Sequence, residues 1–255
     1  MKKLVGLLFF ILTSCFGQTK YGTPEVDPMT IQKNFMDWWT YQSNNIMLSS
    51  DFVALDSNST EISKESFLKQ LSDGTTIPVR LQSNDAIVYY KLFKIEPNAD
   101  SNIKPTIATS SIEEYEHYKM EGTQFPDFNF TDLNAITSTN QSTKNKIVVI
   151  KCWYIHCAAC IKEFPDVNKL AEKYSTRKDI LFISLAEDSP QELKTFLAKK
   201  PLSYSVIPNM KIYMNETLHL NAFPTHFIIN KEGKIAKVLM NYESLEAALE
   251  IESRK

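Results

Sequence analysis

The residues of this chain best suited to chemistry are two cysteines, Cys157 and Cys160, separated by two alanines. An unbroken apolar run (147–150) precedes them, and an amphipathic helical pattern follows. A thiol at the first turn of a helix lies near the positive end of the helix dipole and near free backbone N–H groups, which both favour the thiolate. A second thiol three residues later lies one turn away and can close a disulfide. The spacing therefore predicts reversible dithiol–disulfide exchange.

The same pair could instead form a static disulfide or half of a metal site. A four-ligand zinc site would need a second CxxC or a pair of histidines, and we expect no metal cofactor. Copper or other soft-metal handling, with His156 or His226 as a further ligand, is the alternative function, because soft thiolates select Cu(I). A peroxiredoxin is disfavoured, because Ile150 stands where the P-x-x-x-T-x-x-C pattern has proline. A binding module with a vestigial redox domain is another alternative.

Length and charge restrict the other function classes. The chain has 255 residues, enough for one large domain or two small ones, and 43% of them are hydrophobic. The formal net charge is −2, and no basic stripe is visible. We therefore expect no nucleic-acid partner.

The N-terminus has the features of a targeting segment. A positive start is followed by an apolar run (4–12) that is too short for a stable membrane anchor. The run ends in the sequence LTSC, which is similar to a bacterial lipobox and whose last residue is Cys15. We expect residues 1–14 to be a signal peptide and Cys15 to carry a lipid anchor, although an ordinary secretory peptide is the alternative. The protein would then lie in the cell envelope, on the periplasmic side, and contact the membrane through its lipid.

The remaining chain divides by composition into four parts. Residues 15–27 are polar, with glycines and prolines, and predict a lipid-anchored tether. Residues 28–104 predict a small α+β N-terminal domain, without a chemical motif that would assign its role. Residues 105–121 predict a linker. Residues 122–255 predict the domain that carries the cysteines.

The pattern of this last domain is β–α–β–α–β–β–α, which predicts an α/β sandwich with a central mixed sheet. The unbroken run at 147–150 predicts a central strand buried on both faces. Pro165 should kink the helix that follows the cysteines. The last two strands should form a hairpin at one edge. The predicted elements are strands at 147–150, 180–185, 225–229 and 235–239 and helices that begin near 158, 189 and 244.

This order of elements, with CxxC between the first strand and its helix, is similar to the thioredoxin fold. The chain more closely resembles the membrane-tethered thiol–disulfide oxidoreductases called TlpA-like or ResA-like, over about residues 122–253. Four local features carry the resemblance: an FPDF segment before the first strand, Trp153 four residues before the first cysteine, C-x-x-C-x-x-E-x-P from Cys157 to Pro165, and Phe223-Pro224-Thr225 before the third strand.

The resemblance implies a thioredoxin-like enzyme whose only redox group is its disulfide. Its partners would be exported proteins with cysteines or disulfides, apocytochromes c among them, and an upstream electron donor. The expected direction is reductive. Cys157 would be the exposed nucleophile that forms a mixed disulfide with the partner, and Cys160 the resolving thiol. Glu163 would exchange a proton with Cys160 or raise nearby thiol pKa values by its charge, unless it is a solvated helix residue.

The resemblance also assigns a substrate-binding loop, Phe223, Pro224 and Thr225. A cis Phe–Pro bond would let residue 223 offer its N–H and C=O to an extended substrate segment. The alternative is a trans turn proline.

Departures from the family pattern leave the redox potential and the partner open. His156 replaces the usual Trp before the first cysteine, and Ala159 replaces the usual Pro before the second. His156 would tune the thiolate or simply fill a surface position. Lys151 occupies the position of the buried acid of thioredoxins, and would pair with Glu163 or point out at the strand end. We expect His226 to be a packed strand residue.

Overall fold

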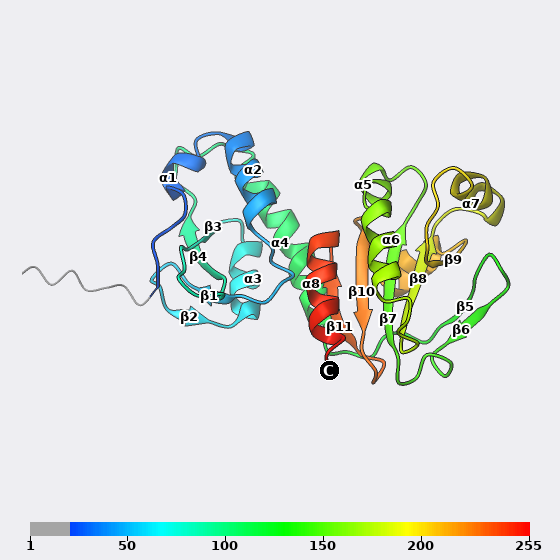
Figure 1. The fold of residues 1–255 in the computed structure, drawn as a ribbon. Helices are drawn as coiled ribbons and strands as arrows, with labels where there is room; N and C mark the ends of the chain where they lie inside the picture. The colour runs from blue at the N-terminus through cyan, green and yellow to red at the C-terminus, as the bar shows by residue number, and fades with distance from the viewer. Residues whose placement is uncertain (1–20) are drawn as a thin grey trace, which may run out of the picture.

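The computed structural model describes residues 21–255, which form two units that lie side by side (Figure 1). The expected signal peptide, the lipidated Cys15 and the first part of the tether lie outside the described residues. No helix within the described range is both long and apolar enough to cross a membrane.

The N-terminal unit is an α+β structure built on a four-stranded sheet, as its sequence predicts. Its strand order is β2-β1-β4-β3, and only β1 and β4 run parallel. The core between sheet and helices is apolar, with Trp38, Phe67 and Leu68 fully buried. The strands are β1 (Val53–Leu55), β2 (Glu61–Ile62), β3 (Thr76–Arg80) and β4 (Tyr89–Lys94), and the helices are α1 (Pro28–Ile31), α2 (Phe35–Asn45), α3 (Lys64–Ser72) and α4 (Ile103–Met120).

Helix α4 corrects the prediction of a linker at residues 105–121. Pro105 and the polar residues around it suggested an irregular segment, but Pro105 is the third residue of α4 and lies in its first turn, where its missing N–H breaks no helical hydrogen bond. Ile103 and Ile107 are fully buried in the N-terminal core. Apolar burial therefore makes this segment a helix of the N-terminal unit.

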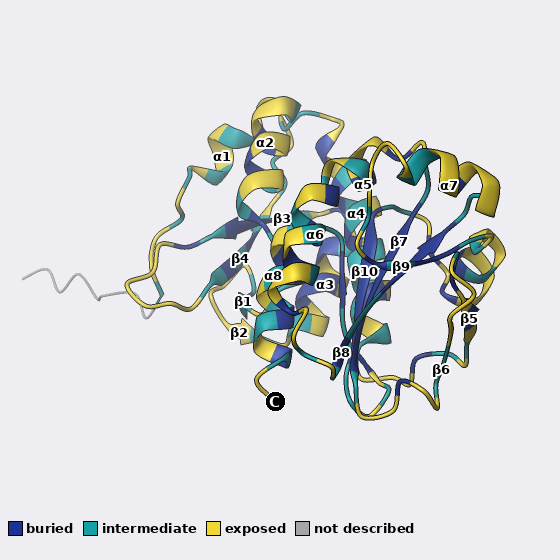
Figure 2. Ribbon diagram, turned by 45° about the vertical axis from the view of Figure 1, so that its right-hand side comes forward, coloured by how far each residue is buried: buried dark blue, intermediate teal, exposed yellow. Residues whose placement is uncertain are grey.

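The C-terminal unit contains a five-stranded mixed sheet in the order β11-β10-β7-β8-β9. Strand β7 is central, and all of its residues are buried, as predicted for an unbroken apolar run. Helices cover the sheet, whose strands are the darkest part of Figure 2. The strands are β7 (Ile147–Trp153), β8 (Ile180–Ala186), β9 (Ser205–Ile207), β10 (Thr225–Ile229) and β11 (Ile235–Leu239), and the helices are α5 (Ala158–Lys162), α6 (Phe164–Lys173), α7 (Pro190–Leu197) and α8 (Tyr242–Glu252).

The edge hairpin and the break before Pro165 are confirmed. Strands β10 and β11 pair antiparallel, with β11 at the edge of the sheet. The helix after the cysteines is divided into α5 and α6, with Pro165 in the first turn of α6. Strand β9, the π-helical turn η1 (Tyr213–Thr217) and a small hairpin of β5 (Asn129–Thr131) and β6 (Thr137–Thr139) are not predicted by the sequence pattern. Each spans only three to five residues, too few to show a period.

The two units meet along the edge strand β11. The Gly122 N–H donates to the Ile235 carbonyl at 2.7 Å, and the Ile235 N–H donates to the Thr123 carbonyl at 2.9 Å. Lys237 on β11 forms ion pairs with Asp51 at 2.8 Å and with Glu121 at 3.2 Å. The segment after α4 thus pairs with an edge that would otherwise expose its backbone groups.

Candidate active site

Cys157 and Cys160 form a disulfide at the start of helix α5. Cys157 is the N-cap residue, and its Sγ accepts a hydrogen bond from the Cys160 backbone N–H at 3.1 Å. The predicted position at a strand-to-helix junction is confirmed. Cys157 is less exposed than predicted for the nucleophile, since only 6% of its surface is accessible. It is still more exposed than Cys160, which is fully buried. A partner therefore reaches the disulfide from the side of Cys157.

The disulfide belongs to an apolar cluster that also contains Trp153 and Phe164. The rings of these two residues meet edge to face, with centroids 5.0 Å apart. Trp153 is thus a packing residue, as expected. Cys152 points to the opposite face of the sheet, where it belongs to a separate cluster and has no disulfide partner. Burial raises the pKa of the Cys152 thiol, which keeps it protonated and unreactive.

The Phe223–Pro224 peptide bond is cis, as predicted, and directly precedes β10. The Phe223 ring meets the Tyr154 ring edge to face at 5.5 Å, and both pack against the cluster that holds the disulfide. Thr225 is fully buried, and its hydroxyl donates to the Ala222 carbonyl at 2.7 Å. Thr225 therefore stabilises the shape of the loop, while the half-buried Phe223 faces the site.

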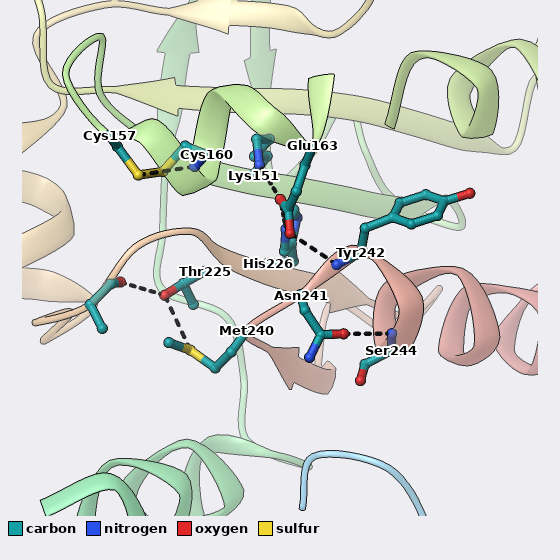
Figure 3. A network of polar contacts seen from close by, with 11 residues as sticks. Lys151, Cys157, Cys160, Glu163, Thr225, His226, Met240, Asn241, Tyr242 and Ser244 are labelled. Atoms are coloured by element: carbon teal, nitrogen blue, oxygen red, sulfur yellow. Dashed lines mark hydrogen bonds and ion pairs between the residues drawn. A yellow bond between two sulfur atoms is a disulfide. The ribbon is translucent and has the colours of Figure 1, made fainter. Parts of the chain in front are cut away.

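Glu163, at the junction of α5 and α6, is the centre of a buried polar network (Figure 3). Its Oε2 lies 2.7 Å from Lys151 Nζ and 3.0 Å from His226 Nε2. Its Oε1 accepts the Tyr242 backbone N–H at 3.0 Å. Of the two positions expected for Lys151, the structure shows the one that pairs with Glu163. His226 is packed in its strand, as expected, but the sequence did not reveal its contact with Glu163.

Burial and neighbouring charge act against each other in this network. Burial favours a raised pKa for Glu163, but the hydrogen bond from His226 and the charge of Lys151 outweigh it, so that the pKa is lowered. Burial lowers the pKa of Lys151, and the Glu163 carboxylate opposes that shift. Burial, helped by the charge of Lys151, lowers the pKa of His226 to about 4. The 2.7 Å contact of Lys151 Nζ with Glu163 is that of an ammonium group with a carboxylate, and the lowered pKa of His226 leaves its imidazole neutral at neutral pH.

His156 lies outside this network, exposed beside helix α7. It borders an open groove of about 360 Å³ together with Asp188, Glu192 and Phe196. The two histidines considered as metal ligands thus occupy different places, one at the surface and one in the Glu163 network. In the part of the chain that the structure describes, no three His, Cys, Asp or Glu side chains are grouped as a metal site would require.

Comparisons with known proteins match the C-terminal unit. Residues 122–238 match the AhpC/TSA family. The thiol-disulfide oxidoreductase ResA of Bacillus cereus (strain ATCC 10987 / NRS 248) is 30% identical over 130 residues, which are 50% of this chain and 75% of that protein. The thioredoxin-like protein YneN of Bacillus subtilis (strain 168) is 26% identical over 137 residues, 52% of this chain and 80% of that protein.

Among solved structures, a DsbE-type thiol:disulfide interchange protein from Chlorobium tepidum is similar, with a TM-score of 0.47 and 22% identity. The similarity covers 52% of this chain and 95% of that one. The family match begins at residue 122, directly after helix α4 and its C-cap.

Proposed function

Because the chain belongs to the ResA-like thiol–disulfide oxidoreductases, enzymes of the thioredoxin fold, we propose that Cys157 and Cys160 reduce disulfides of exported proteins. The observation that supports this assignment most is the disulfide at the N-terminus of α5, combined with the cis Phe223–Pro224 bond packed against the same cluster. A static disulfide needs no such loop beside it.

The proposed reaction begins with the reduced enzyme. The Cys157 thiolate attacks one sulfur of a partner disulfide, so that a mixed disulfide forms and the other partner sulfur leaves as a thiolate. Cys160 then attacks Cys157 Sγ, which closes the enzyme disulfide and releases the second partner sulfur. Two electrons pass to the partner, and its two sulfurs each take up a proton. The disulfide form in this structure is the product state, which an upstream electron donor must reduce.

The loop before β10 would position the partner. Phe223 packs against the cluster that holds the disulfide, and its backbone N–H and C=O would pair with an extended segment in the manner of an added strand. The Phe223 and Tyr154 rings, both half-buried, give the partner an apolar surface next to Cys157.

The location and the substrate class are part of the proposal. The LTSC sequence supports lipidation of Cys15 and attachment to the membrane in the cell envelope. Exported proteins whose cysteines must be reduced, such as apocytochromes c, would then be within reach.

Insulin reduction in the presence of dithiothreitol tests the assignment. Cys157→Ser should abolish the activity above the rate of dithiothreitol alone, because the nucleophile is lost. Cys152→Ala is the matched control and should retain activity, because this thiol lies on the other face of the sheet. Cys160→Ser should accumulate a mixed disulfide that identifies the partner. Unchanged activity of Cys157→Ser would refute the proposal.

A further inference from the structure

A layer of buried polar side chains lies next to the apolar cluster that holds the disulfide. On the face of the sheet toward Glu163, β7 presents Val149, Lys151 and Trp153 in turn. Val149 belongs to one apolar cluster, and Trp153 belongs to another, which holds the disulfide. Lys151 lies between them, and its neighbours in register are His226 on β10 and Ser184 on β8. All three side chains of this polar layer are fully buried.

The contacts of Glu163 with this layer specify its charge. Lys151 Nζ and His226 Nε2 both reach Oε2, and a backbone N–H of α8 reaches Oε1. A carboxylate can accept all three hydrogen bonds, whereas a protonated carboxyl on Oε2 would place its hydrogen against two donors. The geometry therefore favours an ionised Glu163.

The contacts of His226 specify its tautomer. Its Nδ1 is buried and has no hydrogen-bond partner among residues 21–255, while its Nε2 faces Glu163. A neutral ring with its hydrogen on Nε2 donates to the carboxylate and leaves Nδ1 as an unprotonated acceptor. An imidazolium would bury an unpaired N–H and a second positive charge beside Lys151, which costs more than an unpaired acceptor.

We propose that His226 is a positioning residue: together with Lys151, its neutral imidazole holds Glu163 as a carboxylate, so that Glu163 acts on the cysteine pair as a constant negative charge and not as a proton carrier. The inference rests on the proposed function only in that Cys157 and Cys160 react as a dithiol. The proton of Cys160 then passes to the thiolate that leaves the mixed disulfide, and Glu163 raises the thiol pKa values by its charge.

The other groups near the network carry no charge at neutral pH. From the segment before β9, Tyr204 contributes a buried hydroxyl without a hydrogen-bond partner among the described residues, and burial raises the pKa of that hydroxyl. From α8, Tyr242 contributes its backbone N–H, while Cys160, three residues before Glu163, belongs to the neighbouring apolar cluster. Among the described groups that contact Glu163, Lys151 is therefore the one with a charge at neutral pH.

The first test needs no variant. Nitrogen NMR of the ¹⁵N-histidine-labelled protein should show a neutral His226 with its hydrogen on Nε2 from pH 8 down to pH 5. An imidazolium at pH 7, or the tautomer with hydrogen on Nδ1, would overturn the proposal.

The second test is the rate at which iodoacetamide alkylates the reduced protein as a function of pH. The wild type should show thiol ionisation alone above pH 5. In His226→Phe, Glu163 loses a donor and its pKa rises, so that an inflection appears between pH 5 and 7 and alkylation at pH 6 accelerates about three- to tenfold, the effect of a thiol pKa lower by half to one unit. His226→Gln should restore the wild-type profile, because its amide can donate to the same oxygen.

Matched controls separate the possible failures. His117→Phe replaces another buried histidine, on α4, and should leave the alkylation profile unchanged. A folded His226→Phe with the wild-type profile would refute the positioning role. If the wild type forms no reversible disulfide with glutathione, the proposed function fails, while the NMR test still decides the state of His226. The NMR test also decides if His226→Phe does not fold.

Discussion

The two units of this protein are built alike, each a small sheet with helices, but they bury charge differently. At the centre of the N-terminal unit the large buried side chains, such as Trp38 and Leu68, are apolar. The C-terminal unit places Lys151 and His226 at the centre of its sheet, beside the reactive disulfide. A buried ion without a partner destabilises a fold, so charge in a core suggests a function that requires it. The central strands of the N-terminal sheet thus pack through apolar side chains, whereas the central strands of the C-terminal sheet hold a lysine and a histidine that contact Glu163.

The sharpest way to test this comparison is to remove the buried charge. Lys151→Met should lower the free energy of unfolding by about 3–5 kcal/mol, because it leaves Glu163 without its cationic partner. The double variant Lys151→Met/Glu163→Gln should recover much of that loss, because an amide carries no charge. Urea denaturation at pH 7 measures all four members of this cycle. If the double variant is no more stable than Lys151→Met, the charge pair is not what makes this layer sensitive.

The packing of the N-terminal unit should affect stability without affecting chemistry. Leu68→Ala should cost about 2–5 kcal/mol in unfolding free energy, because the side chain is fully buried and leaves a cavity. The alkylation rate of the reduced Cys157 should stay within twofold of wild type under conditions where the variant is folded. A large change in that rate would show that packing in the N-terminal unit is transmitted to the active site, which would weaken the distinction between the two units.

Each unit buries one histidine, and the third test concerns His117 of the N-terminal unit. Burial lowers the pKa of His117 on α4 to about 4, as it does for His226. Because the unfolded chain binds a proton below about pH 6.5 and the folded chain does not, His117 destabilises the fold as pH falls from 6.5 to 4, by up to about 3 kcal/mol. His117→Gln should therefore gain stability relative to wild type across this window in urea denaturation. A constant difference between the two proteins at all pH values would contradict the lowered pKa.

The difference between variant and wild type is the informative quantity here. Burial raises the pKa of Glu114 on the same helix to about 7, which has the opposite effect on the pH dependence. Subtracting the two pH profiles removes the contribution of Glu114, since both proteins contain it.

The features that the sequence predicts correctly are those that depend on residues close together in the chain. The CxxC position at a helix start, the cis bond before Pro224 and the central strand β7 depend on neighbouring residues, and all three are confirmed. The contact between His226 and Glu163 depends on the register of β10 against β7, which places His226 opposite Lys151. No local pattern encodes that pairing. Two ionisable residues in otherwise apolar strands were the only available signal.

Helix α4 is a second feature that depends on residues far away in the chain, and here the sequence prediction was wrong. Its polar residues and Pro105 resembled a linker, and only contacts with distant residues reveal which of its side chains are buried. Ile103 and Ile107 belong to the same apolar cluster as Phe67 and Leu68 of α3. These two residues lie more than 30 positions earlier in the sequence. A sparse apolar pattern on a long helix is therefore easily mistaken for an irregular connection.

The smallest expected effect concerns the boundary between the units, where the N-terminal unit contributes charged groups. Lys237 on β11 pairs with Asp51 and Glu121, and its side chain is 21% exposed. Asp51 is largely exposed but the Glu121 side chain is only 15% exposed, so we expect Lys237→Met to cost about 1–2 kcal/mol in unfolding free energy, between the values for exposed and buried ion pairs. The backbone pairing of residues 122–123 with β11 should persist, because it does not depend on the lysine.

Hydrogen exchange can distinguish the contributions of the ion pairs and the backbone pairing. In Lys237→Met, the Gly122 and Ile235 amides should exchange only slightly faster, while the alkylation rate of reduced Cys157 stays unchanged. Lys231→Met, in the turn before β11, serves as a control, because Lys231 is half-exposed and forms no ion pair with the N-terminal unit among the described residues. Loss of protection at both amides would show that the ion pairs, and not the backbone hydrogen bonds, hold the units together. In that case the contact between the two units would depend on charged side chains, as the core of the C-terminal unit does. The difference between the two units in buried charge would then hold for their cores and not for the contact between them.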